Sequence, residues 1–184
     1  MNILEEVLTR EHAMLMAVNA EGDPECRKHA DEFKKHRSAQ FSVWFEATLE
    51  SYLDDLMVAE AENRNLMTYK YARMDNLIPS ENNDPLIETI TAIQIAWQLE
   101  MAEKYPGLMK NARGIVSAEN SELSVTFAGY LSAELESYSG KTLKLLFQDI
   151  EGYKKKGINM SEKIYEKLIA DFGYSSLADF ESAE

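Results

Sequence analysis

Apolar residues recur along the chain at the three- and four-residue spacing of α-helices, and runs that alternate like β-strands are missing. The first helix is predicted over residues 2–20, and the strongest over 85–104, where Leu86, Ile90, Ile93 and Trp97 form an inward stripe. The other predicted helices run from about Glu25 through the segment EFKKHRSAQF, then over about 44–62, 66–77, 122–137, 140–156 and 160–171, with a last turn near 176–182. The pattern therefore predicts an all-α protein of eight or nine helices, forming one compact domain over residues 1–184.

Several polar residues, prolines and glycines predict where these helices begin and end. A break is expected near Ser42, because serine is a favourable N-cap and an unbroken helix would be long for a globular domain. Asp84 followed by Pro85 is typical of an N-cap and a first helical residue. Helix ends are expected at Gly22–Pro24, Tyr105–Pro106–Gly107, Gly157 and Gly173, and residues 108–120 are expected to be irregular.

The two halves of the chain, 1–77 and 85–172, resemble each other across the connector 78–84. A shift of 94 positions applied to residues 48–74 gives five identities in 27 positions, pairing Thr48 with Thr142, Leu49 with Leu143, Asp55 with Asp149, Asn65 with Asn159 and Tyr71 with Tyr165. Competing registers pair LESY at 49–52 with LESY at 135–138, and FSVWF at 41–45 with LSVTF at 123–127. Two explanations stay open: a pair of four-helix units with a cleft at their shared seam, or convergence among acidic helices of one apolar period.

Charge and composition exclude several classes of protein. The formal net charge is −13 and the pI is about 4.7, which argues against general binding to nucleic acid or to anionic membranes. Acidic residues near the N-terminus are unlike a secretory leader, and apolar runs are far shorter than the ~20 residues of a membrane-spanning helix. With a single cysteine, Cys26, the chain is expected to be a soluble cytoplasmic protein.

Four strings carry a resemblance to a known family. They are SAQFSVWFEATLESYLDDL, NRNLMTYKYARM, AIQIAWQLEMAEKYPGL and LSAELESYSGKTLKLL, and in combination they resemble the bacterial family catalogued as Domain of Unknown Function 4125, over nearly the whole chain. The resemblance implies a helical bacterial protein with no established activity. The chain departs from the family where it has Glu11–His12, since members tend to carry a Glu–Trp pair in the first helix.

Aromatic residues supply the candidate ligand site. Tyrosines and tryptophans at helical spacing are usually core residues, but at a seam between halves they could also line a pocket. Arg73 and Arg113 lie beside the strings that resemble the family, and each is expected to have a carboxylate or a set of carbonyls as partner. The candidate ligand-binding residues are Trp44, Tyr52, Tyr71, Arg73, Trp97, Arg113 and Tyr138.

Acidic residues supply the alternative, a divalent metal site. Glu46 and Glu50 are four positions apart and Glu100 and Glu103 are three apart, so each pair lies on one helical face. Facing helices of a bundle can bind metal through such carboxylates, although in a protein of this charge they are more often a solvated face. These four glutamates are the metal candidates, and HExxH and paired CxxC motifs are missing.

A basic stretch from Arg27 to Arg37 follows Cys26 in this otherwise acidic chain. It could bind an anion or activate the thiol, or it could pair with acidic helices of the same fold. No catalytic signature is specific, so the sequence favours a non-enzymatic module that binds a small molecule or a protein partner. The alternative is a metal-dependent hydrolase using the clustered carboxylates. The sequence identifies no cofactor.

Overall fold

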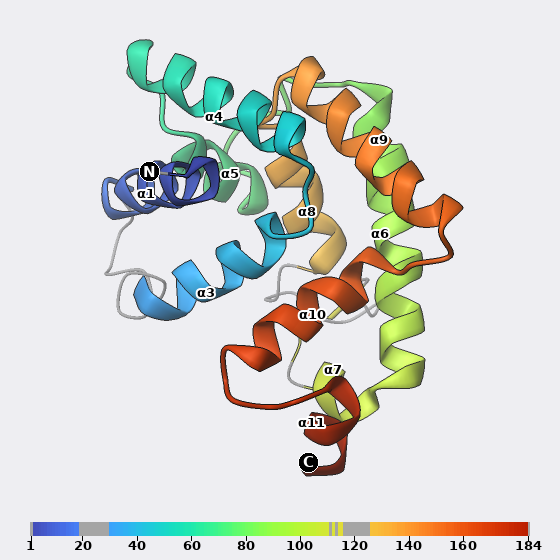
Figure 1. The fold of residues 1–184 in the computed structure, drawn as a ribbon. Helices are drawn as coiled ribbons and strands as arrows, with labels where there is room; N and C mark the ends of the chain where they lie inside the picture. The colour runs from blue at the N-terminus through green and yellow to red at the C-terminus, as the bar shows by residue number, and fades with distance from the viewer. Residues whose placement is uncertain (1, 19–29, 111, 113, 116–125, 184) are drawn as a thin grey trace.

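The structure is a computed structural model that describes residues 2–18, 30–110, 112, 114–115 and 126–183. Over this part of the chain the regular structure is entirely helical, so the predicted all-α domain is confirmed (Figure 1). The helices described are α1 (Ile3–Met16), α3 (Ala30–Phe41), α4 (Glu46–Ala61), α5 (Leu66–Met74), α6 (Pro85–Lys104), α7 (Pro106–Lys110), α8 (Phe127–Leu135), α9 (Gly140–Lys155), α10 (Met160–Ala170) and α11 (Leu177–Ala183).

Most helix boundaries lie close to their predicted places. The Asp84 carboxylate accepts the Leu86 N–H at 2.9 Å and Pro85 is the first residue of α6, as the sequence predicts. Gly157 and Gly173, with φ of +66° and +90°, follow the ends of α9 and α10. Two expectations were wrong: α1 ends at Met16 rather than near residue 20, and residues 108–110 belong to the short helix α7. The predicted stop at Gly22–Pro24 and the predicted helical segments 25–29 and 122–125 lie outside the described residues.

The break between α3 and α4 is confirmed, but its cap is not the predicted serine. Ser42 donates its hydroxyl to the Ala39 carbonyl at 2.8 Å, so it ends α3 instead of starting α4. Phe45 is the N-cap of α4, and its N–H donates to Asp149 of α9 at 2.9 Å. A distant carboxylate therefore accepts the N–H of the N-cap residue, the bond that the N3 side chain makes in a capping box, and no local sequence pattern indicates this arrangement.

The helix contacts repeat between the two halves of the chain. In the first half α1 packs against α3, α4 and α5, and in the second half α6 packs against α8, α9 and α10. Between the halves α4 packs against α9, α5 against α8, and α3 against α10. Exchanging α1, α3, α4 and α5 for α6, α8, α9 and α10 leaves this set of contacts unchanged. Figure 1 shows α1 and α6 on opposite sides, with α4 and α9 meeting between them at the top.

Two aspartates join α4 and α9 in a reciprocal way. Asp149 of α9 accepts the N–H of Phe45 at the start of α4, and Asp55 of α4 accepts the N–H of Ser139 at the start of α9, at 3.0 Å. Each pair of corresponding residues lies 94 positions apart. We call these two contacts the reciprocal caps, and each fixes the N-terminal end of one helix to the interior of the other.

An aromatic cluster lies at the centre of the molecule, where the halves meet. The ring centroids of Trp44 and Tyr138 are 5.8 Å apart with nearly perpendicular planes, and Tyr52 lies 4.8 Å from Tyr138. All three side chains are buried in the main hydrophobic core. Such edge-to-face contacts stabilise a core beyond the area that they bury. A second, smaller core joins α6 and α10 to α11 through Met101, Ile169 and Leu177.

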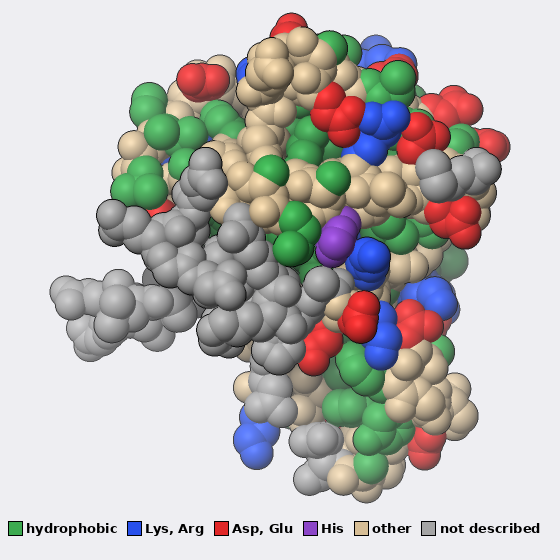
Figure 2. Space-filling model, turned by 90° about the vertical axis from the view of Figure 1, so that its left-hand side faces the viewer, with side chains coloured by type: hydrophobic (Ala, Val, Ile, Leu, Met, Phe, Trp, Pro, Cys, Tyr) green, Lys and Arg blue, Asp and Glu red, His purple; other side chains and the backbone are tan. Residues whose placement is uncertain are grey.

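Among the described residues, no helix is long and apolar enough to cross a membrane. On the face drawn in Figure 2, acidic and basic side chains alternate over the described surface and do not gather into a patch of one sign.

Candidate functional site

Four charged side chains are buried together where α1, α3, α5 and α8 converge. Glu11, Arg37, Lys70 and Glu134 are each at most 2% exposed, and we call them the buried ionic cluster. The Arg37 guanidinium donates to Glu11 at 2.7 Å and to Glu134 at 2.8 Å. Lys70 donates to Glu134 at 2.6 Å, and its ammonium lies 3.8 Å from the centre of the Tyr130 ring. Charged groups need such close partners when water is excluded.

Two tyrosine hydroxyls and an amide complete the hydrogen bonds of the cluster. Tyr52 donates to Glu11 at 2.6 Å, and Tyr138 and Gln40 donate to Glu134 at 2.6 and 2.9 Å. Burial together with the neighbouring Glu11 raises the pKa of Tyr52 well above its usual range, so the phenol remains a donor. Burial together with Glu134 does the same to the pKa of Tyr138.

Glu134 remains ionised within this cluster. Burial alone would raise its pKa, but the charges of Arg37 and Lys70, and the hydrogen bonds from Lys70 and Tyr138, outweigh burial and hold the pKa well below its usual range. Two carboxylates therefore face two cations, and the formal charge of the cluster is zero. Arg37 is fully engaged with Glu11 and Glu134, which makes it a structural group rather than a cation available to an anionic ligand.

An inner cavity of about 780 Å³ lies beside the buried ionic cluster, bounded by α3, α6, α8, α9 and α10. This volume is within the range of small-molecule sites. Aliphatic and aromatic side chains form most of its wall, including Phe33, Trp44, Tyr71, Ile90, Phe127, Tyr130, Leu131, Tyr138, Leu146, Met160, Ile164, Tyr165 and Leu168. A largely apolar wall of this kind favours a ligand with a large apolar surface.

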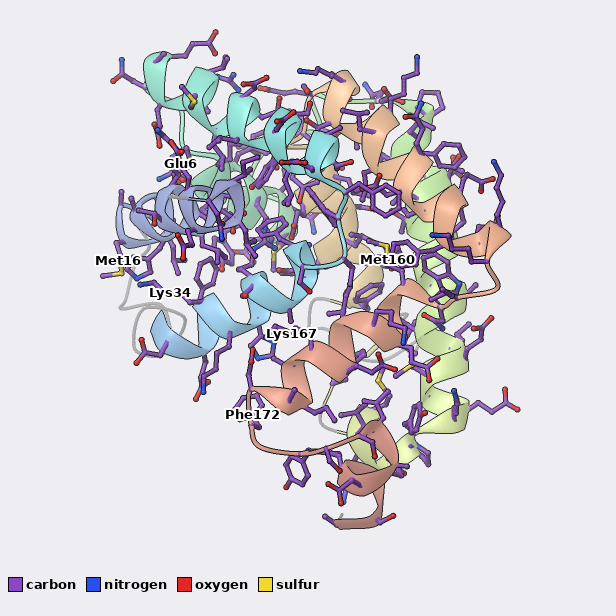
Figure 3. All side chains as sticks on the ribbon, viewed as in Figure 1. Glu6, Met16, Lys34, Met160, Lys167 and Phe172 are labelled. Atoms are coloured by element: carbon purple, nitrogen blue, oxygen red, sulfur yellow. The ribbon has the colours of Figure 1, made fainter. Side chains whose placement is uncertain are left out.

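Two amides on α6 line the inner cavity and make only long hydrogen bonds. Gln94 and Gln98 lie one turn apart and are 8% and 6% exposed. Gln94 accepts from the Ser161 hydroxyl at 3.4 Å and contacts the Met160 sulfur at 3.9 Å; Figure 3 shows Met160 between α10 and α6. Gln98 donates to Ser161 at 3.3 Å and accepts from Tyr165 at 3.4 Å. The distances to oxygen exceed the 2.7–3.2 Å of ordinary N–H···O hydrogen bonds, so both amides keep unused capacity.

The rim of the inner cavity includes polar groups from α3. Glu32 and His36 form part of this rim, and partial loss of water around the His36 ring lowers its pKa, although the charge of Glu32 opposes the shift. The shift favours the uncharged form of the imidazole. Phe172, which follows α10 on the side of α3 (Figure 3), has its ring centre 4.8 Å from the Lys35 ammonium.

The structure brings together four of the seven candidate ligand residues. Trp44, Tyr71 and Tyr138 line the inner cavity, and Tyr52 lies directly behind Trp44 and Tyr138. Trp97 lies elsewhere, in a separate hollow that it shares with Glu100 and Asn159.

The two candidate arginines lie outside the inner cavity or outside the described residues. Arg73 pairs with Glu136 at 2.5 Å and donates to the Ile78 carbonyl at 2.7 Å, which confirms that it has a carboxylate and a carbonyl as partners. It does not line the inner cavity. Arg113 lies outside the described residues, as do Cys26 and residues 27–29 at the start of the basic stretch. In the described part of that stretch Arg37 pairs with acidic residues of the same fold, and the Lys35 ammonium lies over the Phe172 ring.

The metal candidates are all exposed. Glu46 and Glu50 lie on α4, and Glu100 and Glu103 lie on α6. In the part of the chain that the structure describes, no three histidine, cysteine or carboxylate side chains are placed to hold one metal ion. The arrangement therefore lends no support to a metal site formed by these glutamates.

Sequence reasoning missed the residues that define the site, above all Gln94, Gln98, Lys70 and Glu134. A charged or amide side chain on the apolar face of a helix was the available signal. Gln94 and Gln98 follow Ile90 at the spacing of the inward stripe, and Glu11 does the same after Val7. Such positions indicate buried polar groups, but only the fold shows which of them meet.

A family model described as "Protein of unknown function (DUF4125)" matches residues 1–182. No curated protein and no solved structure matches the chain.

Proposed function

The chain belongs to the family of proteins of unknown function DUF4125, and from the geometry of its own interior we propose that it is a non-enzymatic protein that binds a small, largely apolar molecule in the inner cavity. One observation carries the proposal: a volume of about 780 Å³ surrounded by apolar and aromatic side chains, with a few polar groups converging on it. This combination is typical of sites that bind small molecules.

The buried ionic cluster supports binding rather than catalysis. Its carboxylates are fully hydrogen-bonded, and its tyrosines have raised pKa values that oppose ionisation. A general base needs a pKa near the working pH and access to a substrate proton. The cluster instead anchors α1, α3, α5 and α8 around one wall of the inner cavity, holding that wall rigid.

A neutral dye tests this proposal directly. Nile red is uncharged, largely apolar and fluorescent in apolar surroundings, so it should bind the purified protein with a saturable rise in emission. Ile164→Trp places a larger ring in the inner cavity from α10 and should weaken dye binding at least tenfold. Leu99→Trp, at a position 52% exposed on α6, is the matched control and should leave binding unchanged.

Circular dichroism checks that both variants fold. Equal dye affinity in the wild type and in folded Ile164→Trp would refute the proposal, as would the absence of saturable binding. A bound dye should also raise the melting temperature, because a ligand that binds only the folded state stabilises it by about 2.7 kcal/mol at 100 times its Kd.

A further inference from the structure

We infer that Gln94 and Gln98 are the polar anchor of the inner cavity and select an uncharged ligand that presents a hydrogen-bond donor beside an acceptor, such as a carboxamide or a lactam on a planar ring. This inference rests on the proposed function and specifies its ligand class. It follows from comparing the two halves residue by residue.

The reciprocal caps and the aromatic cluster align the second to fourth helices of each half at a shift of 94. Besides pairing Asp55 with Asp149, this shift pairs Trp44 with Tyr138, whose rings touch, and Gln40 with Glu134, which are hydrogen-bonded. It also pairs Tyr71 with Tyr165, and both line the inner cavity.

A different shift aligns the first helices, α1 and α6. Asn65 and Asn159, paired by the shift of 94, are the N-caps of α5 and α10. Asn65 donates its side-chain amide to the Met14 carbonyl at 2.7 Å, and Asn159 donates to the Trp97 carbonyl at 3.1 Å. Met14 of α1 therefore corresponds to Trp97 of α6, a shift of 83, and by the same shift Glu11 corresponds to Gln94.

The partners of Glu11 have no polar counterparts in the second half. Glu11 is bound by Arg37 and Tyr52, and the residues 94 positions later are Leu131 and Leu146. The long hydrogen bonds of Gln94 thus have a structural cause: the groups that would satisfy it are leucines, and both leucines line the inner cavity. In the first half Arg37 and Tyr52 fill the space around Glu11. At the corresponding place in the second half, the inner cavity lies beside Gln94.

The polar groups of the inner cavity also indicate the charge of the ligand. A carboxamide both donates and accepts a hydrogen bond, so two of them one turn apart complement a neutral group with the same pair of functions. Among the described residues that line the inner cavity the arginine is Arg37, and it is already bound by Glu11 and Glu134, so an anion would lose its water without gaining an ion pair from it. The tyrosine rings of the wall offer flat apolar surfaces to a planar ligand.

Three probes of nearly equal shape and different charge test the inference by displacement of Nile red. Naphthalene-2-carboxamide is neutral, naphthalene-2-carboxylate is an anion and naphthalene-2-carboxamidine is a cation. The carboxamide should bind at least tenfold more tightly than either ion. Gln94→Leu should remove that preference while Nile red still binds.

A charge substitution makes the test specific to the anchor. Gln94→Glu should reverse the order, so that the amidine binds most tightly, whereas Gln148→Glu on the exposed surface of α9 should leave the order unchanged. If Gln94→Glu does not fold, Gln94→Leu alone decides the matter.

The outcomes separate the two proposals. Failure of Nile red to bind the inner cavity overturns the proposed function and the inference together. If Nile red binds but the carboxylate competes as well as the carboxamide, or folded Gln94→Leu keeps the preference, the inference on ligand class is wrong and the proposed function stands.

Discussion

Glu134 accepts hydrogen bonds from four side chains, namely Arg37, Gln40, Lys70 and Tyr138. Glu134 lies on α8, Arg37 and Gln40 on α3 and Lys70 on α5, so this single carboxylate connects elements from both halves. Removing one partner from a buried ion pair leaves the other charge without compensation, which is far more costly than losing a pair in water.

Glu134→Gln should therefore lower the free energy of unfolding by about 3–5 kcal/mol, measured by urea denaturation. Glu6→Gln is the matched control, because Glu6 pairs with Arg10 at 2.9 Å on the exposed side of α1 and should contribute less than about 1 kcal/mol. Similar losses in both variants would show that burial adds nothing to the ion pairs of the cluster.

The lowered pKa of Glu134 also predicts a direction of pH dependence. A carboxyl group whose pKa is lower in the folded state contributes stability above its unfolded pKa of about 4.3, and loses it as the pH falls toward the folded value. Stability should thus fall steadily below about pH 5. The double variant Lys70→Met/Glu134→Gln keeps the cluster neutral and should show a shallower fall between pH 5 and pH 3 in urea titrations. An equal slope in both proteins would contradict the ionisation assigned to Glu134.

At the scale of the helices, two glycines in and after α9 should respond in opposite ways to an added side chain. Gly152 lies inside the helix, and a Cβ there would meet only the Phe45 ring at an ordinary 3.7 Å. Gly157 follows the helix with φ of +66°, where a side chain would be strained although the space is open. Gly152→Ala should increase the free energy of unfolding by about 0.4–1 kcal/mol and raise the melting temperature. Gly157→Ala should decrease the free energy of unfolding by about 1 kcal/mol and lower the melting temperature. Shifts of the same sign in both variants would contradict this.

The helices were predictable from sequence because each depends on local signals. Apolar spacing, the Asp84–Pro85 start and the glycine ends are contained within a few residues. The N-cap of α4 could not be predicted, because the group that caps it, Asp149, lies 104 positions away from Phe45. The same limit applied to the candidate site. Trp44, Tyr71 and Tyr138 were identifiable as aromatic residues, whereas the position of Gln94 and Leu131 in the wall of one cavity depends on how α6 packs against α8.

At the scale of the whole molecule, the two halves pack against each other through three pairs of helices. The pairs α3–α10, α4–α9 and α5–α8 all join one half to the other, and the buried ionic cluster spans them. We therefore expect the chain to unfold in one cooperative transition despite its repeated pattern of contacts.

Trp44 and Trp97 can show whether the two halves unfold together, because one lies in each half and both are 7% exposed. In the single-tryptophan variants Trp97→Phe and Trp44→Phe, the fluorescence transition of the remaining tryptophan should coincide with loss of helix by far-UV circular dichroism. A second-half transition at lower denaturant than the first would show that the halves unfold separately.

The reciprocal caps have a further consequence when the contact between α4 and α9 is regarded as an interface. A contact in which each side offers the same donor and the same acceptor is isologous, the geometry of a symmetric dimer. Two separate half-chains would have to find each other by diffusion, with an affinity that depends on their dilution. The segment 78–84 ties them together and replaces that encounter with an intramolecular one at an effective concentration set by a short tether. Formation of the α4–α9 contact in this chain is thereby independent of protein concentration.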